Sequence, residues 1–534
     1  MYLGPGVAVP NGPTAGQNGL RDRAGSTATA VSSAAGSAKK AGSRRATQDE
    51  FGIASNEDSP VRGGKLKKFF GEDEAQMLQQ QPLSAQNESL PPVAKKAVDE
   101  SPWYLGPDYL PEDIVISAEG QVKGATLHAL VARLTMHNTF DAPFNNTFLL
   151  TYRSFATTDE LMNLLFARFR INSPEGLTAE QHSEWVSKKQ MPVRLRVFNV
   201  LKSWLESYIY EGEDDRHLHT IRRFTDEMAH HGMENPAKQL GKLLDKREGG
   251  EGLTVRKLIL PESAPPPVLP KTRNIKFLDI DALEMGRQLS LMDHGLYCKI
   301  KPAECLGKAW SNADSADRMA AGIKETISTS NQITGWVAES ILVQQDLKKR
   351  AAWLKHFIAI ADACRSLNNF STMTAIVSGL NSAPVFRLKR TWDALNQRFI
   401  VMLEGMNKIM QSSKNFADYR EMVHRLNPPC VPFLGVYLTD LTFIEDGNPD
   451  RLKSDERLIN FGKRQKTAEV IREIMIYQAT PYNLSVVPGV QRFIMANLIS
   501  ARNDNELYQQ SLKLEPRERE DEKISRLLAE SGFL

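Results

Sequence analysis

The stretch from Asn427 to Asp450 reads NPPCVPFLGVYLTDLTFIEDGNPD. In it, an apolar run lies between a proline pair and a turn, both of which interrupt regular secondary structure. Two prolines directly after Asn427 end any helix that precedes them. The run from Val431 to Leu441 carries few charges and is therefore predicted to be buried. Glu445 and Asp446 follow it, just before a Gly-Asn-Pro turn. The pattern brings two carboxylates to an edge of the fold, although composition alone favours a core segment that ends in a solvated turn.

The composition of the chain is that of an ordinary folded protein. Its 534 residues suffice for three or four domain-sized pieces. The hydrophobic fraction is 41% and the charged fraction is 25%, as in soluble globular proteins. The formal net charge of +3 gives no reason to expect nucleic-acid binding.

The four cysteines, Cys298, Cys305, Cys364 and Cys430, form no CxxC pair and no zinc spacing with histidine. No metal site is predicted, and the cysteines are expected to be reduced, as in a cytosolic protein. The sequence contains no apolar run long enough to span a membrane, and its N-terminus lacks the order of a signal peptide. We therefore predict a cytoplasmic protein.

Residues 1–100 are rich in Gly, Ala, Ser, Gln and Pro and have no period that would bury one face. This segment is predicted to be a disordered tail. Within it, KLKKFFG at 65–71 sets two phenylalanines beside three lysines. Such a basic island offers a contact for a partner or for acidic lipid at the inner face of the plasma membrane. A solvated basic cluster is the simpler interpretation.

Order is predicted to begin near Trp103, with a short strand at 114–116. A helix is predicted at 124–134, where apolar residues recur at steps of three and four. Thr157 or Thr158 is the expected N-cap of the next helix, because two acidic residues follow in its first turn. Further helices are predicted at 193–210 and 216–229.

Histidines are densest at His217, His219, His230 and His231. No cysteine lies near them, and they do not have the HExxH spacing of a zinc site. We therefore interpret them as residues of a solvated helical surface rather than as metal ligands.

Residues 246–275 are first Gly-rich and then Pro-rich, which predicts an extended linker between two helical regions. The proline run at 261–270 also suits a proline-binding domain. As a spacer it needs no such partner, and we favour the spacer.

From Phe277 onward the pattern is helical and compact. The segment 331–380 is predicted to form long amphipathic helices, and the last segment, 516–534, one short amphipathic helix. Apolar residues recur at helical steps within one of the long helices, at Leu354, Phe357, Ile358, Ala361 and Cys364.

The order of residues in PCVPFLGVYLTDL and in the following EDGNPD resembles the signature of Ras-type guanine-nucleotide exchange factors, with a Son-of-sevenless-like catalytic domain. Further pieces resemble the same domain: EMGRQLSLMDHGLY, NQITGWV, LNNFSTMTAIVSGLNSAPVFRL and LINFGKRQKTAEVI. This resemblance extends from Leu278 to Leu514. Upstream, FLLTYRSF and its surroundings are similar to the Ras exchanger motif that precedes this domain in the family.

The resemblance implies an all-α fold of two helical domains, with a protruding antiparallel helical hairpin. The first hairpin helix is expected to start within 433–439 and to run to Asp446, and the second to cover about 458–478. The implied organisation is a disordered tail at 1–100, the exchanger motif at 101–245, the linker at 246–275, the catalytic domain at 276–515 and the segment 516–534.

The resemblance also assigns roles on the hairpin. Asp446 falls where the family places the carboxylate that meets the phosphate loop of the GTPase. Thr442 falls where some family members carry an apolar wedge residue. Its neighbour Phe443 is the alternative candidate for the bulky wedge side chain. Both matched positions depart from the family, because Asp is shorter than the common Glu and Thr is small and polar.

Three more residues match positions that contact the GTPase: Asn381, Phe433 and Asn448. From sequence alone each has a plainer interpretation, respectively a helix C-cap, a core aromatic residue and an Asn-Pro turn. Ser328 stands where some family members carry Arg, which removes one ion pair with the partner.

The chain has no GxxxxGK[ST] loop, no GxSxG and no HExxH, so it is not expected to bind a nucleotide itself or to perform covalent chemistry. The first hypothesis is therefore an exchange factor for a Ras-type small GTPase, Ras or Rap, that needs no cofactor and reaches the membrane through the GTPase. The second is a helical adaptor that binds a GTPase or another partner without releasing nucleotide. A hydrolase has the least support.

Overall fold

The computed structural model describes residues 102–249, 263–270, 275–311, 320–498 and 503–517, together with Leu528 and Ser531. The tail at 1–100, the basic island within it and nearly all of the segment 516–534 lie outside the described residues, so the predictions for them stay predictions. In the part of the chain that is described, helices predominate and no helix is long and apolar enough to cross a membrane.

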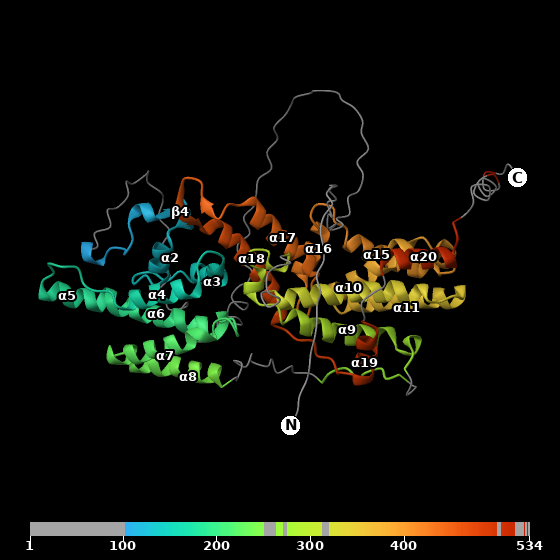
Figure 1. Ribbon diagram of the computed structural model, residues 1–534, viewed down its shortest axis with the longest axis horizontal. Helices are drawn as coiled ribbons and strands as arrows, with labels where there is room; N and C mark the ends of the chain where they lie inside the picture. Colours follow the sequence, from blue (N-terminus) through green and yellow to red (C-terminus); the bar gives the residue numbers. More distant parts are fainter. Residues whose placement is uncertain are drawn as a thin grey trace, which may run out of the picture. The chain divides into compact units, whose positions relative to one another are not determined.

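The first described region is a helical bundle with one two-stranded edge, drawn in blue to green in Figure 1. Thr157 is the N-cap of α4, and a capping box with Glu160 confirms the predicted helix start. The strand predicted at 114–116 is present as β1. The elements are η1 (Trp103–Leu105), η2 (Pro111–Asp113), β1 (Ile114–Ile116), β2 (Val122–Ala125), α2 (Leu127–Leu134), α3 (Ala142–Thr151), η3 (Tyr152–Ser154), α4 (Thr158–Phe169), α5 (Ala179–Trp185), the π-helical turn η4 (Val186–Gln190), α6 (Met191–Ser203), the π-helical turn η5 (Trp204–Tyr208), α7 (Asp215–His230) and α8 (Glu234–Glu248).

The second region is also helical, and polar side chains cap several of its helices. Asp281 caps α9, Asp346 caps α11 and Asn369 caps α12, each through a side-chain oxygen that accepts a backbone N–H. The elements are η6 (Phe277–Asp279), α9 (Ala282–Tyr297), η7 (Pro302–Cys305), η8 (Ala309–Ser311), α10 (Ala321–Leu342), α11 (Leu347–Ser366), α12 (Phe370–Asn381), α13 (Ala383–Phe386), α14 (Lys389–Asp393), α15 (Gln397–Ile409), α16 (Ala417–Arg425), α17 (Leu434–Gly447), β3 (Arg451–Leu452), β4 (Asp455–Asn460), α18 (Phe461–Gln478), α19 (Pro488–Asn497) and α20 (Asp504–Leu514).

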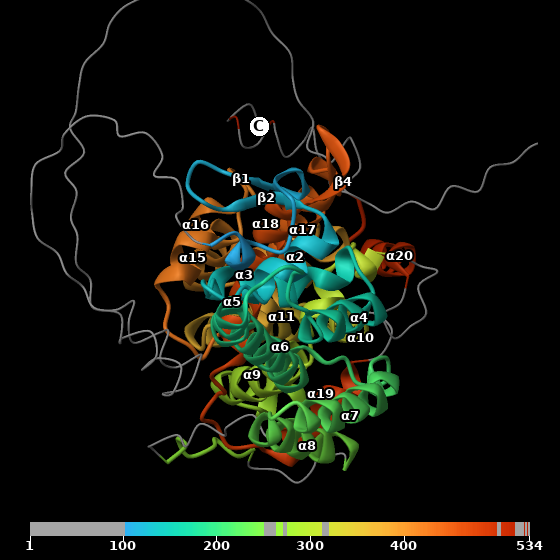
Figure 2. The ribbon, with the colours of Figure 1, turned by 90° about the vertical axis from the view of Figure 1, so that its left-hand side faces the viewer.

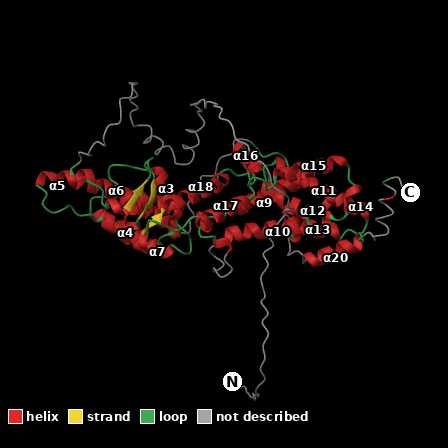
Figure 3. Cartoon of the chain, turned by 90° about the horizontal axis from the view of Figure 1, so that it is seen from above, coloured by secondary structure: helices red, strands yellow, loops and turns green. Residues whose placement is uncertain are grey.

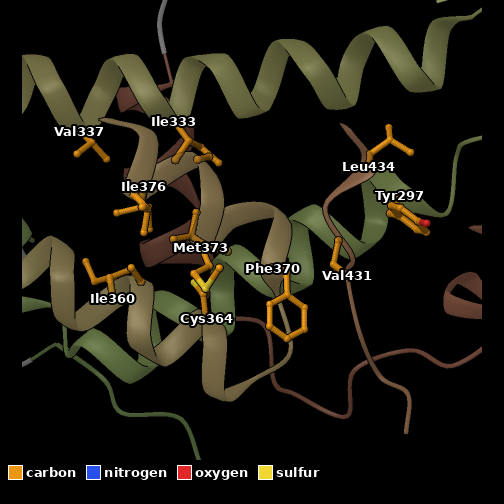
Figure 4. Close-up of a cluster of buried hydrophobic side chains, with 14 of the residues drawn as sticks. Tyr297, Ile333, Val337, Ile360, Cys364, Phe370, Met373, Ile376, Val431 and Leu434 are labelled. Carbon is orange, nitrogen blue, oxygen red and sulfur yellow. The ribbon is translucent and has the colours of Figure 1, made fainter. Parts of the chain in front are cut away.

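Two hydrophobic cores lie on the two sides of the predicted linker. Figure 4 shows the larger core, where side chains of α10, α11 and α12 meet the chain around Val431 and Leu434. Gly379 of α12 permits this packing, since an added Cβ would lie 2.7 Å from the carbonyl oxygen of Thr334 on α10. The five residues predicted to share a helical face are all fully buried: Leu354, Phe357, Ile358, Ala361 and Cys364.

A four-stranded sheet of order β1-β2-β4-β3 joins the two regions. Strands β1, β2 and β4 are labelled in Figure 2, and strands are yellow in Figure 3. Strand β2 pairs antiparallel with β4, so that Gly124 lies opposite Asn460. Gly124 is required here, because a Cβ would lie 2.5 Å from Leu452 Cδ1 and 3.0 Å from the carbonyl oxygen of Ile459. The helix predicted from residue 124 is therefore wrong over its first turn, where the chain is extended. The helix itself begins at Leu127.

Packing of α3 against α18 strengthens this junction. The rings of Phe144 and Phe461 lie with their centroids 4.9 Å apart, and Arg472 Nη2 donates to Thr147 Oγ1 at 2.7 Å. Leu150 of α3 belongs to the core of the second region, whereas Phe461 belongs to the core of the first. Each region therefore supplies side chains to the core of the other.

Two predictions about polar segments need correction. The linker does not start at residue 246, because α8 continues to Glu248. Its described part, 263–270, is extended as predicted and docks on α9, where Glu284 Oε2 accepts the Val268 N–H at 2.9 Å and Arg287 donates to the Pro266 carbonyl at 3.1 Å. His217 is buried rather than solvated, because α7 turns it toward α4, where its Nδ1 lies 3.4 Å from Asp159. The other three histidines of that group are exposed, as predicted.

Candidate functional site

Helices α17 and α18 run side by side and are connected by the strands β3 and β4 (Figure 1). Phe433 is the N-cap of α17, so the first hairpin helix starts within the expected interval and ends at Gly447. The second helix starts at Phe461, three residues later than expected, because residues 455–460 form β4. The hairpin is therefore held by pairing within the sheet as well as by helix packing.

A buried cation anchors the end of α17. The side chain of Lys463 is 2% exposed, and its Nζ donates to Glu445 Oε1 and to Asp450 Oδ1, both at 2.9 Å. Arg464 Nη2 donates to the same Asp450 oxygen at 2.6 Å. Burial alone would raise the pKa of Asp450, but the hydrogen bonds from the two cations lower it below its ordinary value. We call Glu445, Asp450, Lys463 and Arg464 the hairpin clamp.

Asp446 is the accessible member of the carboxylate pair. Its side chain is 58% exposed, and its Oδ1 lies 2.5 Å from Nζ of Lys308, a residue distant in sequence. Glu445 is 25% exposed and is occupied by the hairpin clamp. Only Asp446 is therefore free to exchange one cationic or N–H partner for another without loosening the turn.

The two wedge candidates differ in exposure. Thr442 is half-buried and its hydroxyl donates to the Leu438 carbonyl at 2.8 Å, a bond that fixes its rotamer. It lies one helical turn before Asp446 and so shares its face. Phe443 is 66% exposed and is rotated by about 100° around the helix from Thr442. The bulky apolar side chain at this surface therefore belongs to Phe443, whereas Thr442, on the same face as Asp446, is small.

Asn448 has the role of a turn residue. Its Nδ2 donates to the Ile444 carbonyl at 2.9 Å, and its Oδ1 accepts from Lys466 Nζ at 3.3 Å. These bonds close the C-terminus of α17, where carbonyl groups lack helical partners. The plainer interpretation, an Asn-Pro turn, describes its contacts within the chain.

Phe433 and Asn381 lie away from the hairpin turn. Phe433 is half-buried at the start of α17, and its N–H donates to Tyr419 Oη at 2.6 Å. The length of α17 places it roughly 20 Å from Asp446 along the helix axis. Asn381 is exposed at the end of α12, where its Nδ2 donates to Asn407 Oδ1 at 2.7 Å. These positions suit an extended surface for a macromolecule rather than one small-molecule pocket. Ser328 is exposed on α10.

Lys308 and the two cations of the hairpin clamp are not predicted from the sequence as residues of the site. A fully buried lysine is rare, so Lys463 in GKRQK was predicted only as part of a helix. The signal that could have found it is the pair of acidic residues at the opposite end of the turn, Glu445 and Asp450. Nothing in the sequence around Lys308 indicates its pairing with Asp446.

The described residues contain no group of three or more His, Cys, Asp or Glu side chains that could hold a metal ion. The four cysteines are free thiols, and burial raises the pKa of each above its ordinary value. A thiol with a raised pKa is a poor nucleophile.

Comparison with known proteins identifies two matching families. Residues 284–465 match the model of the RasGEF domain, and residues 121–226 match that of the RasGEF N-terminal motif. Helix α17 lies near the C-terminal end of the first match, which ends within the first turns of α18.

Three relatives resemble most of this chain. Cell division control protein 25 of Candida albicans is 41% identical over 433 residues, which cover 79% of this chain and 32% of that protein. The protein of the same name in Saccharomyces cerevisiae is 34% identical over 443 residues, covering 78% and 28%. Ras guanine nucleotide exchange factor J of Dictyostelium discoideum is 35% identical over 411 residues, covering 76% and 49%. The chain thus spans less than half the length of each of these relatives.

Proposed function

The chain carries both domains of the RasGEF family, and from that premise we propose that it is a guanine-nucleotide exchange factor for a Ras-type small GTPase. It would promote GDP release, and so GTP loading, by inserting the α17–α18 hairpin beside the nucleotide site. No covalent step is involved. The observation that carries the proposal is that Asp446, the accessible member of the Glu445–Asp446 pair, lies on a hairpin fixed by the buried cations of the clamp.

The energetics of release explain why such a hairpin is needed. A GTPase that binds its nucleotide with picomolar affinity holds it with about 16 kcal/mol. Magnesium and the loop that surrounds the phosphates provide most of this affinity. A release factor must therefore disturb these two contacts and stabilise the emptied GTPase in their place.

The residues of the hairpin divide this work. Asp446 accepts the donors that had held the phosphates, and it exchanges Lys308 for them. Phe443, the exposed aromatic residue, supplies the wedge beside the metal position, and Thr442 allows the face of Asp446 to approach closely. The hairpin clamp and the β2–β4 pairing keep the hairpin rigid, so that the GTPase does not push the wedge out.

The remaining partner surface lies along α17 and α12. Phe433 forms a wall for the switch segment of the GTPase, and Asn381 and Asn448 offer amide groups to it. The exposed, extended segment 263–270 suits a proline-binding domain, since Val268 and Leu269 are 44% and 63% exposed. The protein works in the cytoplasm and at the inner face of the plasma membrane, to which the GTPase and the basic island at 65–71 recruit it.

One assay separates the exchange factor from the adaptor. A Ras-type GTPase is loaded with a fluorescent guanine nucleotide, excess unlabelled nucleotide is added, and the signal is followed with and without the full chain. Accelerated release supports exchange, whereas tight binding without faster release shows an adaptor. Repeating the assay with Ras and Rap proteins identifies the preferred partner.

A further inference from the structure

The first helical region contains a cavity of about 280 Å³ that lies apart from the hairpin site. Residues of α2, α4 and the α5–η4 helix line it. This volume is at the lower end of the range for small-molecule sites. None of the six residues proposed to contact the GTPase lines the cavity.

The cavity has an excess of positive charge. Arg168 and Lys189, 6% and 5% exposed, both face a single carboxylate, Asp108, with ion-pair distances of 2.8 and 2.6 Å. Asp108 is the one acidic residue among those that line the cavity. Burial, followed by the charge of Lys189, lowers the pKa of the neighbouring His137. Because buried cations need matching anions, one further negative charge is favoured here.

A buried hydrogen-bond donor also belongs to the lining. Trp185 lines the cavity and is 2% exposed, and its indole Nε1–H has no acceptor among the residues that the structure describes. Buried N–H groups nearly always have a partner, so an acceptor within the cavity is expected. The rest of the lining is largely apolar, with Val131, Leu164 and Ile171.

We infer that this cavity binds a small monocarboxylate with an apolar body. The carboxylate accepts the Trp185 N–H and balances the charge of Arg168 and Lys189, while the apolar body lies against the aliphatic lining. A small molecule fits better than an acidic protein segment, because the two cations are almost wholly buried and only a ligand that enters the cavity reaches them. This inference does not depend on the exchange activity.

The test uses the full chain labelled with 15N-tryptophan and titrated with 3-phenylpropionate. The chain has seven tryptophans, and the Trp185→Phe variant assigns the indole signal of Trp185 by its loss. We expect this signal to shift saturably with the carboxylate, and the neutral 3-phenylpropionamide to bind at least tenfold more weakly. Absence of a saturable shift up to about 10 mM carboxylate would overturn the inference.

Two further variants keep the result interpretable. Ala167 lines the cavity but is exposed on α4, so Ala167→Phe is expected to fill the opening without unfolding the helix and to abolish the shift. Lys188→Gln is the matched control, because Lys188 pairs with Glu184 at the surface, and it should bind 3-phenylpropionate as the parent does. Unchanged binding in Ala167→Phe would contradict the site. Tighter binding of a capped peptide containing aspartate would overturn the small-molecule assignment.

Discussion

Lys308 Nζ lies 2.5 Å from Asp446 Oδ1, so the accessible carboxylate of the hairpin is paired within the free chain. Lys308 itself adopts a left-handed backbone conformation, with φ of 54°, directly after Gly307. Both side chains are partly exposed, so the pair contributes little to stability. In the proposed exchange function, a GTPase has to break this pair before Asp446 can accept the donors that held the phosphates.

Removing the lysine should therefore assist exchange. For Lys308→Ala we expect nucleotide release to become faster by up to about fivefold, since an exposed ion pair is worth at most about 1 kcal/mol. The fluorescent release assay at saturating GTPase measures this. In the Lys308→Ala, Asp446→Ala double variant the gain should vanish, because the lysine acts through the carboxylate. A gain that persists there would show another role for Lys308.

Replacing the carboxylate should have the opposite effect. Asp446→Ala is expected to slow maximal release roughly tenfold to a hundredfold, the value of a charge-assisted hydrogen bond, while the initial binding of the loaded GTPase is retained. Asp446→Glu should release nucleotide at least as fast as the parent, because it restores the longer reach. Glu456→Ala, an exposed acidic residue on β4, is the control. Release at the parental rate by Asp446→Ala would mean that Asp446 is a solvated turn residue.

The two aromatic residues of α17 should be separable by kinetics. Phe433→Ala is expected to raise the GTPase concentration needed for half-maximal release, because a wall of the binding surface is lost. Phe443→Ala should instead lower the maximal rate, since its exposed ring acts only during insertion. Titrating each variant with GTPase distinguishes the effects. Equal behaviour of the two variants would be inconsistent with separate roles.

Support of the hairpin by the first region is tested at Gly124. Gly124→Val places side-chain atoms where Leu452 lies and should separate β2 from β4. We expect a lower melting temperature and slower exchange, measured on the same preparation. Gly241→Ala is the matched control, since its Cβ meets no atom within 4 Å on α8, and it should stabilise the helix slightly. Parental exchange by Gly124→Val would exclude the supporting role.

The hairpin clamp predicts a pH dependence. The pKa of Asp450 is lowered in the folded chain, so its contribution to stability is complete above the unfolded value of about 3.9 and is lost as the pH falls through the lower folded value. Asp450→Asn should cost no more than about 1 kcal/mol at pH 7, because Arg464 loses its acidic partner but solvent screens the Asp450 side chain, which is 62% exposed. Thermal melts of both proteins from pH 7 to pH 3 should show this difference narrowing only below about pH 4. A difference that is already lost near pH 6 would contradict the assignment.

Features that depend on residues close together in the sequence could be predicted, whereas features that depend on contacts between distant residues could not. The helices around Leu354 and Thr157 were predicted correctly, since periodicity and caps are local signals. Gly124 was wrongly included in a helix because the partner that keeps it extended, β4, lies far away in the chain. Asp446 is proposed as a site residue from residue order alone, whereas its pairing with Lys308 depends on the folded geometry. Burial of Lys463 runs against the usual preference of lysine, so the acidic residues Glu445 and Asp450 were the only sequence signal for the clamp.

The pairing of β2 with β4 also has a consequence for how the chain folds. Its partners Gly124 and Asn460 are more than three hundred residues apart, and the entropic cost of closing a loop rises with its length. Contacts within each helical region are far more local and are expected to form first. The sheet is then completed late, after both cores exist. A chain emerging from the ribosome thus obtains its supported hairpin only after both β2 and β4 have been synthesised, which delays its competence until both regions are in place.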